Sequence, residues 1–283
     1  MATNWLVTGV SSGLGRLIAE KVLARGDTVV GTSRRADALS DLEASHPGRV
    51  RVLAVDLANQ AAVRRAVDDA FASIDRIDVV VSNAGYGLLG AGEEATDEQV
   101  RDIVDTNLIG SIALIRAVLP HLRRQGGGRI LQVSSEGGQI AYPAFGLYHA
   151  TKWGIEGFVE AVAQEVESFG IAFTLVEPGA ARTEFGANLA RTAPLADYAG
   201  TPADRLREAI KGEWVIKGDP DRMTDAMIRL ADRQGPLPKR LVLGADAYTN
   251  VRRALTARLA ELEDQRSIAL DADYTDAELA ALS

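Results

Sequence analysis

Seven short runs of apolar and β-branched residues limit the fold of this chain more than any other feature. None of them alternates apolar with polar residues, as a strand with one face in water would. A strand that is apolar throughout is typical of a parallel sheet covered on both faces. The runs lie at residues 5–9, 28–34, 50–57, 78–85, 129–135, 172–179 and 240–246.

Helical patterns separate these runs. Apolar residues recur at steps of three and four in segments 97–125 and 152–170. The alternation of strand and helix predicts an α/β fold of the Rossmann type, a doubly wound parallel sheet of about seven strands flanked by helices. We expect residues 1–283 to form a single domain. In it, 180–240 would be a substrate-binding lid and 247–283 a helical extension packed on the body or on a partner subunit.

The composition excludes several classes of protein. With 47% hydrophobic and 25% charged residues the chain is ordinary for a globular protein. It has no cysteine, and its three histidines are too scattered to suggest a metal site. The net charge of −8 argues against a nucleic-acid partner. Since no apolar run has the length of a membrane span and no secretory signal is evident, we expect a cytoplasmic protein without membrane attachment.

A glycine-rich segment, TGVSSGLG at residues 8–15, follows the first strand and opens a helix. Gly9, Gly13 and Gly15 allow a tight turn, so that a pyrophosphate can approach backbone N–H groups at the helix N-terminus. Glycines also mark plain turns, but this position in a strand–helix unit predicts a dinucleotide site. We assign three further residues of the loop to that site: Ser11, Ser12 and Leu14.

The end of the second strand indicates which dinucleotide is bound. NAD-binding folds usually carry an acidic residue there, whereas this chain has Arg34 and Arg35. A guanidinium can bind the 2′-phosphate of NADP(H) through charge-assisted hydrogen bonds. NADP(H) is therefore favoured, with NAD(H) as the alternative, although either arginine could simply face water. Asp56, assigned to the site with Leu57, could accept from the adenine amino group or cap the next helix.

A tyrosine and a lysine lie one helical turn apart at the start of the helix predicted after the fifth run. Tyr148 and Lys152 would share a helix face, and Ser135 precedes Tyr148 by thirteen positions. With the glycine segment, NAG at 83–85, Asn107, PG at 178–179 and Thr183, these residues resemble the short-chain dehydrogenase/reductase family in its compact single-domain form. The arginines and the long C-terminal tail look most like its hydroxysteroid-dehydrogenase-like branch.

This resemblance implies an oxidoreductase that interconverts a ketone or aldehyde and an alcohol by hydride transfer. Tyr148 would exchange a proton with the substrate oxygen, and Lys152, together with oxidised nicotinamide, would lower its pKa. Lys152 would also hold the nicotinamide ribose. Ser135 would donate to the substrate oxygen. Asn107 would serve a water-linked proton relay, or alternatively satisfy buried backbone groups.

The resemblance also implies the remaining cofactor contacts. The NAG segment would form the floor under the adenosine ribose, and Thr183 would meet the nicotinamide carboxamide or a phosphate. The residues so assigned, beyond those of the glycine segment, are Asn83, Ala84, Gly85, Tyr148, Lys152, Pro178, Gly179 and Thr183.

The expected substrate is a bulky, mostly hydrophobic carbonyl compound or alcohol, because apolar and aromatic residues occupy the segments that should line the cleft. Each could instead belong to the core of the lid. A non-catalytic NADP(H)-binding sensor or scaffold is the alternative function. We expect a homodimer or homotetramer formed through helices 97–125 and 152–170. The cleft residues are Tyr86, Leu88, Leu89, Ile140, Tyr142, Phe145, Leu147, Phe185, Leu195, Tyr198 and Trp214.

Overall fold

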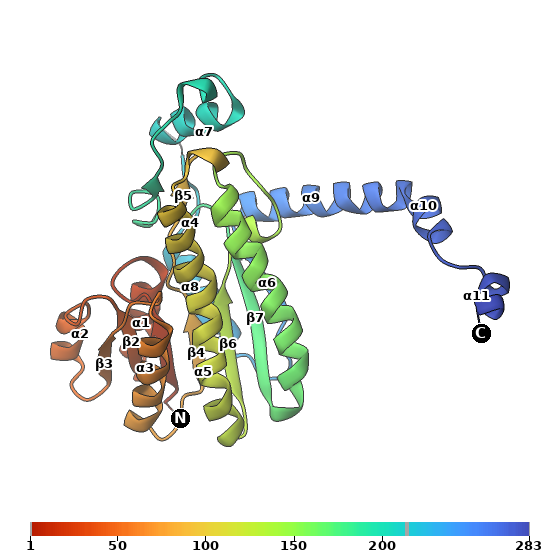
Figure 1. The fold of residues 1–283 in the computed structure, drawn as a ribbon. Helices are drawn as coiled ribbons and strands as arrows, with labels where there is room; N and C mark the ends of the chain where they lie inside the picture. Colours follow the sequence, from red (N-terminus) through yellow and green to blue (C-terminus); the bar gives the residue numbers. More distant parts are fainter. Residues whose placement is uncertain (1, 213–214, 283) are drawn as a thin grey trace.

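A seven-stranded parallel sheet forms the centre of the computed structural model, which describes residues 2–212 and 215–282 (Figure 1). The strand order is β3-β2-β1-β4-β6-β7-β9, and every pair is parallel. The predicted α/β fold and its seven strands are confirmed. The strands are β1 (Asn4–Thr8), β2 (Thr28–Ser33), β3 (Val50–Ala54), β4 (Val79–Ser82), β6 (Gly128–Val133), β7 (Ile171–Pro178) and β9 (Arg240–Leu243).

Helices cover both faces of the sheet, which explains why its strands are apolar throughout. Leu6 and Val80 point into a core with one set of helices, whereas their neighbours Trp5 and Val79 point into a core with the other set. Successive strand residues alternate between two buried faces, so neither face needs polar side chains. The first set is α3 (Gln60–Ser73), α5 (Gly110–Arg124) and α6 (Gly146–Val166); the second is α1 (Gly13–Ala24), α2 (Ser40–Ser45) and α8 (Pro220–Asp232).

One long helix carries Asn107. It runs from α4 (Asp97–Val104) through a π-helical segment, Asp105–Ile109, into α5. With 28 residues, this helix is long enough and apolar enough to cross a membrane, judged by length and composition alone. In the fold, however, side chains such as Ile103, Leu114 and Val118 are fully buried within the domain. The helix is therefore placed as a core helix.

The segment predicted as a lid, 180–240, divides into two parts. Its first part contains β8 (Ala190–Arg191), which pairs in parallel with β5 (Leu88–Leu89), and α7 (Pro202–Lys211), at the top of Figure 1. Its second part contains α8, which packs on α1 and places Met227 and Ile228 in the core. Helix α8 lies on the sheet because the crossover from β7 to β9 needs a helix there. The assignment of 180–240 as a substrate-binding lid stays a prediction.

A buried carboxylate, that of Glu94, connects the segment that contains β8 and α7 to the body. It accepts hydrogen bonds from the amides of Ala91 (2.7 Å) and Leu195 (3.0 Å), from the Thr192 hydroxyl (3.0 Å) and from Arg207 of α7. Burial alone would raise the pKa of Glu94, but these partners outweigh burial and lower it to about 2. The ionised form of Glu94 therefore stabilises the folded segment around β8 and α7.

We expect Glu94→Gln to reduce the free energy of unfolding by roughly 1–3 kcal/mol at neutral pH, because Arg207 loses its charged partner. The folded pKa of about 2 lies below the ordinary value of 4.5, so the stabilisation is complete above pH 4.5 and is lost as the pH falls toward 2. The difference in free energy of unfolding between Glu94→Gln and wild type should disappear as the pH falls through that range. Thermal unfolding followed by circular dichroism measures it, with the exposed neighbour Glu93→Gln as control; a difference that persists at low pH would contradict the assignment.

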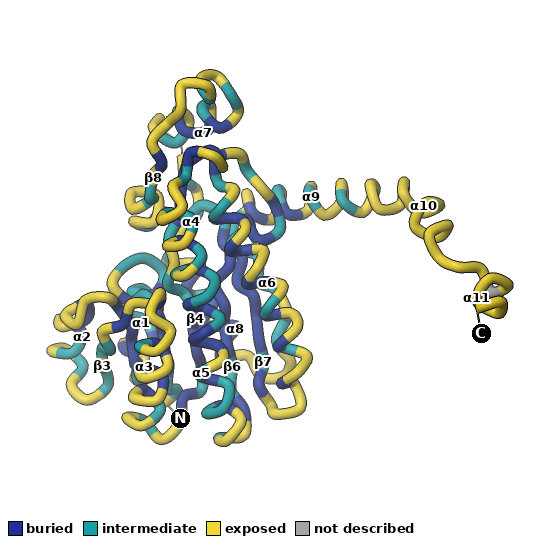
Figure 2. The backbone as a smooth tube through the Cα atoms, in the orientation of Figure 1, coloured by how far each residue is buried: buried dark blue, intermediate teal, exposed yellow. Residues whose placement is uncertain are grey.

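The C-terminal extension is helical, as predicted, but only its beginning packs on the body. It consists of α9 (Ala245–Asp264), α10 (Arg266–Asp271) and α11 (Asp276–Leu282). Ala247 and Val251 are buried, whereas the later part of α9 and the helices beyond it extend away from the sandwich (Figures 1 and 2).

Candidate active site

The glycine loop connects β1 to α1 and is hydrogen-bonded to the carboxyl end of β2. Gly9 has a φ of +73°, a conformation that favours glycine, and its N–H donates to the Thr32 carbonyl (2.9 Å). A Cβ on Gly15 would lie 2.4 Å from the Gly9 carbonyl oxygen. These two glycines therefore let α1 begin directly against the end of β1.

The N-terminus of α1 has no side-chain cap. Ser12 occupies the N-cap position with extended backbone (φ −163°), and its hydroxyl makes no capping hydrogen bond. The first-turn N–H groups, including those of Gly13 and Leu14, thus have no side-chain cap at the positive end of the helix dipole. A phosphate group could accept hydrogen bonds from them.

The loop after β7 reaches across to this helix end. The Gly179 N–H donates to the Leu243 carbonyl (2.8 Å), which fixes the turn that follows Pro178. Thr183 then lies close to the glycine loop, its Cβ 3.6 Å from where a Cβ on Gly13 would be. The fold therefore brings Thr183 to the helix end, as its assignment to the cofactor site requires.

The NAG segment lies where the strand order reverses, between β1 and β4. The amides of Asn83 and Ala84 donate to the Thr8 hydroxyl (2.8 and 3.0 Å), and the Asn83 side chain donates to the Thr8 carbonyl (2.9 Å). A Cβ on Gly85 would lie 3.1 Å from Asn107 Oδ1. The segment thus forms a floor between the glycine loop and the π-helical segment. Open α/β sheets bind ligands at such a reversal.

The two arginines after β2 differ in their surroundings. Arg34 is exposed, and within the described ranges no hydrogen bond or ion pair holds its guanidinium. Its charge acts on Tyr86: burial and Asp102 raise the pKa of Tyr86, and the charge of Arg34 opposes that rise. Arg35 lies 3.8 Å from the Asp37 carboxylate and is 68% exposed. Arg34 is the better placed of the two to bind an anion in the crevice.

The side chains of Asp56 and Leu57 are engaged within the protein rather than directed to the expected cofactor contact. Asp56 Oδ1 accepts from the Ala58 N–H (3.0 Å) in a local turn, and the cap of α3 is Asn59, which accepts from Ala62 (3.0 Å). Leu57 points into the core. A cofactor contact at Leu57 would therefore involve its backbone.

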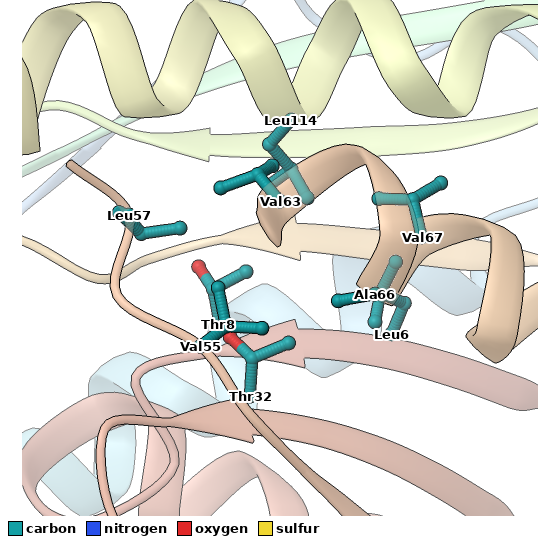
Figure 3. Close-up of a pocket in the computed structure, with 9 residues that line it drawn as sticks. All are labelled: Leu6, Thr8, Thr32, Val55, Leu57, Val63, Ala66, Val67 and Leu114. Atoms are coloured by element: carbon teal, nitrogen blue, oxygen red, sulfur yellow. The ribbon is translucent and has the colours of Figure 1, made fainter. Parts of the chain in front are cut away.

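A small cavity beneath this edge of the sheet is not a ligand site. It measures about 10 Å³, at the lower limit for a single water molecule. Figure 3 shows its lining, which is almost entirely apolar: Leu6, Thr8, Thr32, Val55, Leu57, Val63, Ala66, Val67 and Leu114.

Tyr148 and Lys152 come together on α6, as predicted. The Lys152 Nζ lies 5.6 Å from the centre of the Tyr148 ring and donates to the Val133 carbonyl (3.1 Å). Both side chains are buried at the carboxyl edge of the sheet. Ser135 follows β6, and its hydroxyl accepts from the Gly137 N–H (3.0 Å) and lies close enough to the Tyr148 phenol to lower the pKa of that group. The three predicted catalytic side chains therefore converge.

The predicted lowering of the Tyr148 pKa by Lys152 does not appear in this structure, and its further lowering by oxidised nicotinamide stays a prediction. Burial raises the pKa of Tyr148, the Ser135 hydroxyl opposes that rise and the charge of Glu136 adds to it, so that the pKa is about 12. Burial likewise lowers the pKa of Lys152 to about 8, against the influence of Glu156. The ammonium is directed to the Val133 carbonyl, so desolvation decides both shifts.

Asn107 lies in the π-helical segment and is fully engaged. Its Oδ1 accepts from the Tyr86 N–H (3.0 Å), and its Nδ2 donates to the Tyr86 carbonyl (2.7 Å) and to the Thr151 hydroxyl (3.4 Å). π-Helical insertions are frequent at functional sites. Asn107 thus satisfies buried backbone groups, one of the two roles expected, while the proton relay remains a prediction.

Glu156 is a site residue that the sequence analysis missed. It is buried one turn after Lys152 and accepts from the Ser134 hydroxyl (2.6 Å), from the Gln139 amide (2.5 Å) and from Arg240 (2.8 Å). These bonds attach the segment around Ser135 to the helix that carries Tyr148. The signal was in the sequence, because Tyr148, Lys152 and Glu156 follow one another at steps of four.

His149, the residue after Tyr148, is buried and holds the same segment. Its Nδ1 meets the Gly137 carbonyl (2.9 Å), and its Nε2 accepts from the Tyr142 N–H (2.9 Å). Since a carbonyl only accepts and an amide only donates, the ring is neutral with its proton on Nδ1. Burial lowers the pKa of His149, in agreement with that state.

Aromatic side chains surround Tyr148. The rings of Phe185 and Phe145 lie 5.9 and 6.1 Å from it, centre to centre. Of the predicted cleft residues, those gathered here are Tyr86, Leu88, Phe145, Leu147 and Phe185. Leu89 and Tyr198 belong to a separate apolar cluster with residues of α7. Ile140 is buried, Leu195 is exposed, and the Tyr142 hydroxyl accepts from Asn250 of α9. Trp214 lies outside the described residues.

Comparisons with known proteins agree with this geometry. The family model of the short chain dehydrogenases matches residues 3–194. An oxidoreductase of Botryotinia fuckeliana is 36% identical over 95% of this chain and 99% of its own. The 3-ketodihydrosphingosine reductase of Bacteroides thetaiotaomicron is 40% identical over 65% of each chain.

Solved structures are also similar. A short-chain dehydrogenase from Streptomyces avermitilis has 38% identity and a TM-score of 0.89, covering 97% of this chain and 99% of its own. A metagenomic short-chain oxidoreductase in complex with NADP has 25% identity and a TM-score of 0.68, covering 85% of this chain and 96% of its own.

Proposed function

Because the chain belongs to the short-chain dehydrogenase family, an oxidoreductase family, we propose that it interconverts a bulky, mostly hydrophobic ketone or aldehyde and its alcohol with NADP(H). One observation carries the proposal. Ser135, Tyr148 and Lys152 converge at the carboxyl edge of the sheet, beside the uncapped N-terminus of α1.

The residues of the crevice suit a dinucleotide. The first-turn N–H groups of α1 would hold the pyrophosphate, and Arg34 would bind the 2′-phosphate that distinguishes NADP(H). When bound, the nicotinamide supplies or accepts the hydride. The related oxidoreductase complexed with NADP supports a nicotinamide cofactor. The preference for NADP(H) rests on Arg34, which no other side chain of the described residues holds in place.

Tyr148 would donate the proton that the substrate oxygen takes up. With a pKa of about 12 the phenol is protonated at neutral pH, so it can donate a proton to a substrate oxygen that gains negative charge. The Ser135 hydroxyl would donate a hydrogen bond to the same oxygen. The pKa of Lys152, about 8, leaves that side chain mostly cationic at neutral pH. Its charge would favour the phenolate left after transfer.

An apolar substrate fits the wall around Tyr148. Phe145 and Phe185 flank the phenol, and Leu88 and Leu147 pack in the same cluster. The relative from Bacteroides thetaiotaomicron is named for the reduction of 3-ketodihydrosphingosine, which also supports a bulky ketone.

Turnover on a panel of ketones tests this function. The protein is mixed with NADPH and with ketones of increasing apolar size, and the loss of the reduced-nicotinamide absorbance is followed. We expect oxidation of NADPH that becomes more efficient as the apolar part of the ketone grows. Tight binding of NADPH without turnover on any ketone would instead favour a sensor or scaffold.

Glu156→Gln should move the pH profile of catalysis. Removing the carboxylate should lower the pKa of Lys152, now about 8, since Glu156 is the charge that raises it. The alkaline limb of the kcat/KM profile should shift to lower pH by roughly one unit. Glu160→Gln, which removes another Arg240 partner two turns from Lys152, is the control. A shift of equal size in both variants, or in neither, would contradict a specific role for Glu156.

A further inference from the structure

We propose that Arg240 and Glu177 are positioning residues of the active site, which hold Glu156 in place and set how strongly its charge acts on Lys152. Both lie on strands of the sheet, Glu177 in β7 and Arg240 at the start of β9. Their effect on turnover rests on the proposed function, whereas their effect on the charge of Lys152 does not.

The Arg240 guanidinium joins three carboxylates. It lies 2.8 Å from the carboxylate of Glu156 and 2.7 Å from that of Glu177, and it also pairs with Glu160. The side chains of Glu156 and Glu177 are buried, whereas half of the Glu160 side chain is exposed. Strand β9 is the edge strand and pairs with β7. One side chain therefore connects α6 with two neighbouring strands.

Two buried carboxylates share this one guanidinium. A buried charge is costly unless an opposite charge lies close to it. In residues 2–212 and 215–282, Arg240 is the only cation within ion-pair distance of Glu156 or Glu177. Burial and the charge of Glu156 raise the pKa of Glu177 to about 7, although Arg240 opposes that rise. A single positive charge therefore cannot balance both carboxylates when Glu177 is ionised.

Glu156 passes the contact on to the segment around Ser135. Its Oε1 accepts from the Ser134 hydroxyl (2.6 Å), and its Oε2 accepts from Gln139 and from Arg240. The segment fits closely against the carboxylate, because a Cβ on Gly138 would lie 1.8 Å from Glu156 Oε1. A shift of the Glu156 side chain would therefore disturb the segment on both sides of Ser135.

Glu156 also acts on Lys152, one helical turn before it. Its charge opposes the effect of burial, which lowers the pKa of Lys152 to about 8. The charged groups that face Glu156 are thus Lys152 on the same helix, Arg240 of β9 and Glu177 of β7. Loss of the positive charge at Arg240 should raise the pKa of Lys152, whereas loss of the negative charge at Glu177 should lower it. These opposite directions distinguish an electrostatic role from a general loss of packing.

An NMR titration of lysine side chains labelled with ¹³C at Cε tests the pairing in the full-length protein without substrate. The sequence has five lysines, so Lys152→Met suffices to identify the Lys152 signal. We expect Arg240→Gln to raise the pKa of Lys152 from about 8 to about 9 and Glu177→Gln to lower it below 8. Arg240→Lys keeps the positive charge and should leave the pKa of Lys152 near its wild-type value.

Ketone reduction gives the second measurement. The alkaline limb of the kcat/KM profile should move to higher pH in Arg240→Gln and to lower pH in Glu177→Gln, as the NMR titration does. We also expect kcat of Arg240→Gln to fall roughly 10-fold at neutral pH, because Ser135 loses part of its support. KM for NADPH should change less than about twofold, since neither residue belongs to the cofactor crevice.

Arg25→Gln is the matched control. Arg25 is 32% exposed, against 30% for Arg240, and it too pairs with one buried and one more exposed carboxylate, those of Asp27 and Asp232. It lies at the end of α1, before the amino end of β2. Its removal should lower the thermal stability but leave the pKa of Lys152 unchanged.

The proposal is overturned if the pKa of Lys152 stays constant in Glu177→Gln, moves in the same direction in Glu177→Gln and Arg240→Gln, or moves as far in Arg25→Gln. Circular dichroism checks the folding of each variant. If Arg240→Gln does not fold, Glu177→Gln and Arg240→Lys decide, by the lowered and the unchanged pKa expected of them. A wild-type protein that reduces no ketone would contradict the proposed function and leave the NMR result in force.

Discussion

Tyr148→Phe should lower kcat for ketone reduction by a factor on the order of 10² to 10⁴, the range typical of a lost general acid. In the proposed mechanism the phenol is the proton donor, and burial keeps it protonated at neutral pH. Phenylalanine keeps the ring and its packing against Phe145 and Phe185 but removes the proton. Binding of NADPH, measured by fluorescence titration, should stay near its wild-type strength.

Tyr142→Phe is the matched control for this variant. Its hydroxyl also lies in the segment after Ser135, but it accepts from Asn250 (2.9 Å) and bonds to Glu136 rather than to Tyr148. We expect a much smaller loss of kcat in Tyr142→Phe. If the two variants lost activity equally, or if Tyr148→Phe remained fully active, Tyr148 would not be the acid.

Arg34→Ala should raise KM for NADPH roughly 10- to 100-fold, since hydrogen bonds to charged groups contribute about 1.5–3 kcal/mol each. KM for NADH should change little, because NADH has no 2′-phosphate. Steady-state kinetics with both cofactors and one ketone measures the two values. An equal change in both would mean that Arg34 shapes the site without recognising the phosphate.

Arg35→Ala is the companion variant. Arg35 is next in sequence and equally charged, but it lies beside Asp37 and is largely exposed. Its removal should raise KM for NADPH far less than the removal of Arg34. The reverse order would assign the phosphate contact to Arg35 and correct the interpretation of the crevice.

The sheet could be predicted because its chemistry is local. A strand buried on both faces must be apolar throughout, so each of the seven runs stands out in the sequence. The run predicted at 50–57 ends as a strand at Ala54, because Asp56 forms a turn. The two-residue strands β5 and β8 were not predicted, since so short a strand has no periodicity.

The site was only partly predictable because its electrostatics depend on distant segments. The spacing of Ser135, Tyr148 and Lys152 in the sequence predicted that these three side chains lie close together, as they do in the structure. The direction of the pKa shift of Tyr148 did not follow, because burial by Phe185 and neighbouring residues appears only after folding. Glu94 accepts hydrogen bonds from Leu195 and Arg207, about a hundred residues further along the chain. Neither the spacing nor the type of these residues predicts that they meet Glu94.

Deuterium transfer most directly tests whether the protein moves a hydride to a ketone whose oxygen is protonated by Tyr148. The protein is incubated with a bulky apolar ketone and NADPH that carries deuterium at the transferable C4 position, and the product is analysed by mass spectrometry and NMR. We predict an alcohol with one deuterium on the carbinol carbon, formed by wild type and scarcely at all by Tyr148→Phe. An alcohol without deuterium there, or equal deuterium transfer by both proteins, would contradict the mechanism.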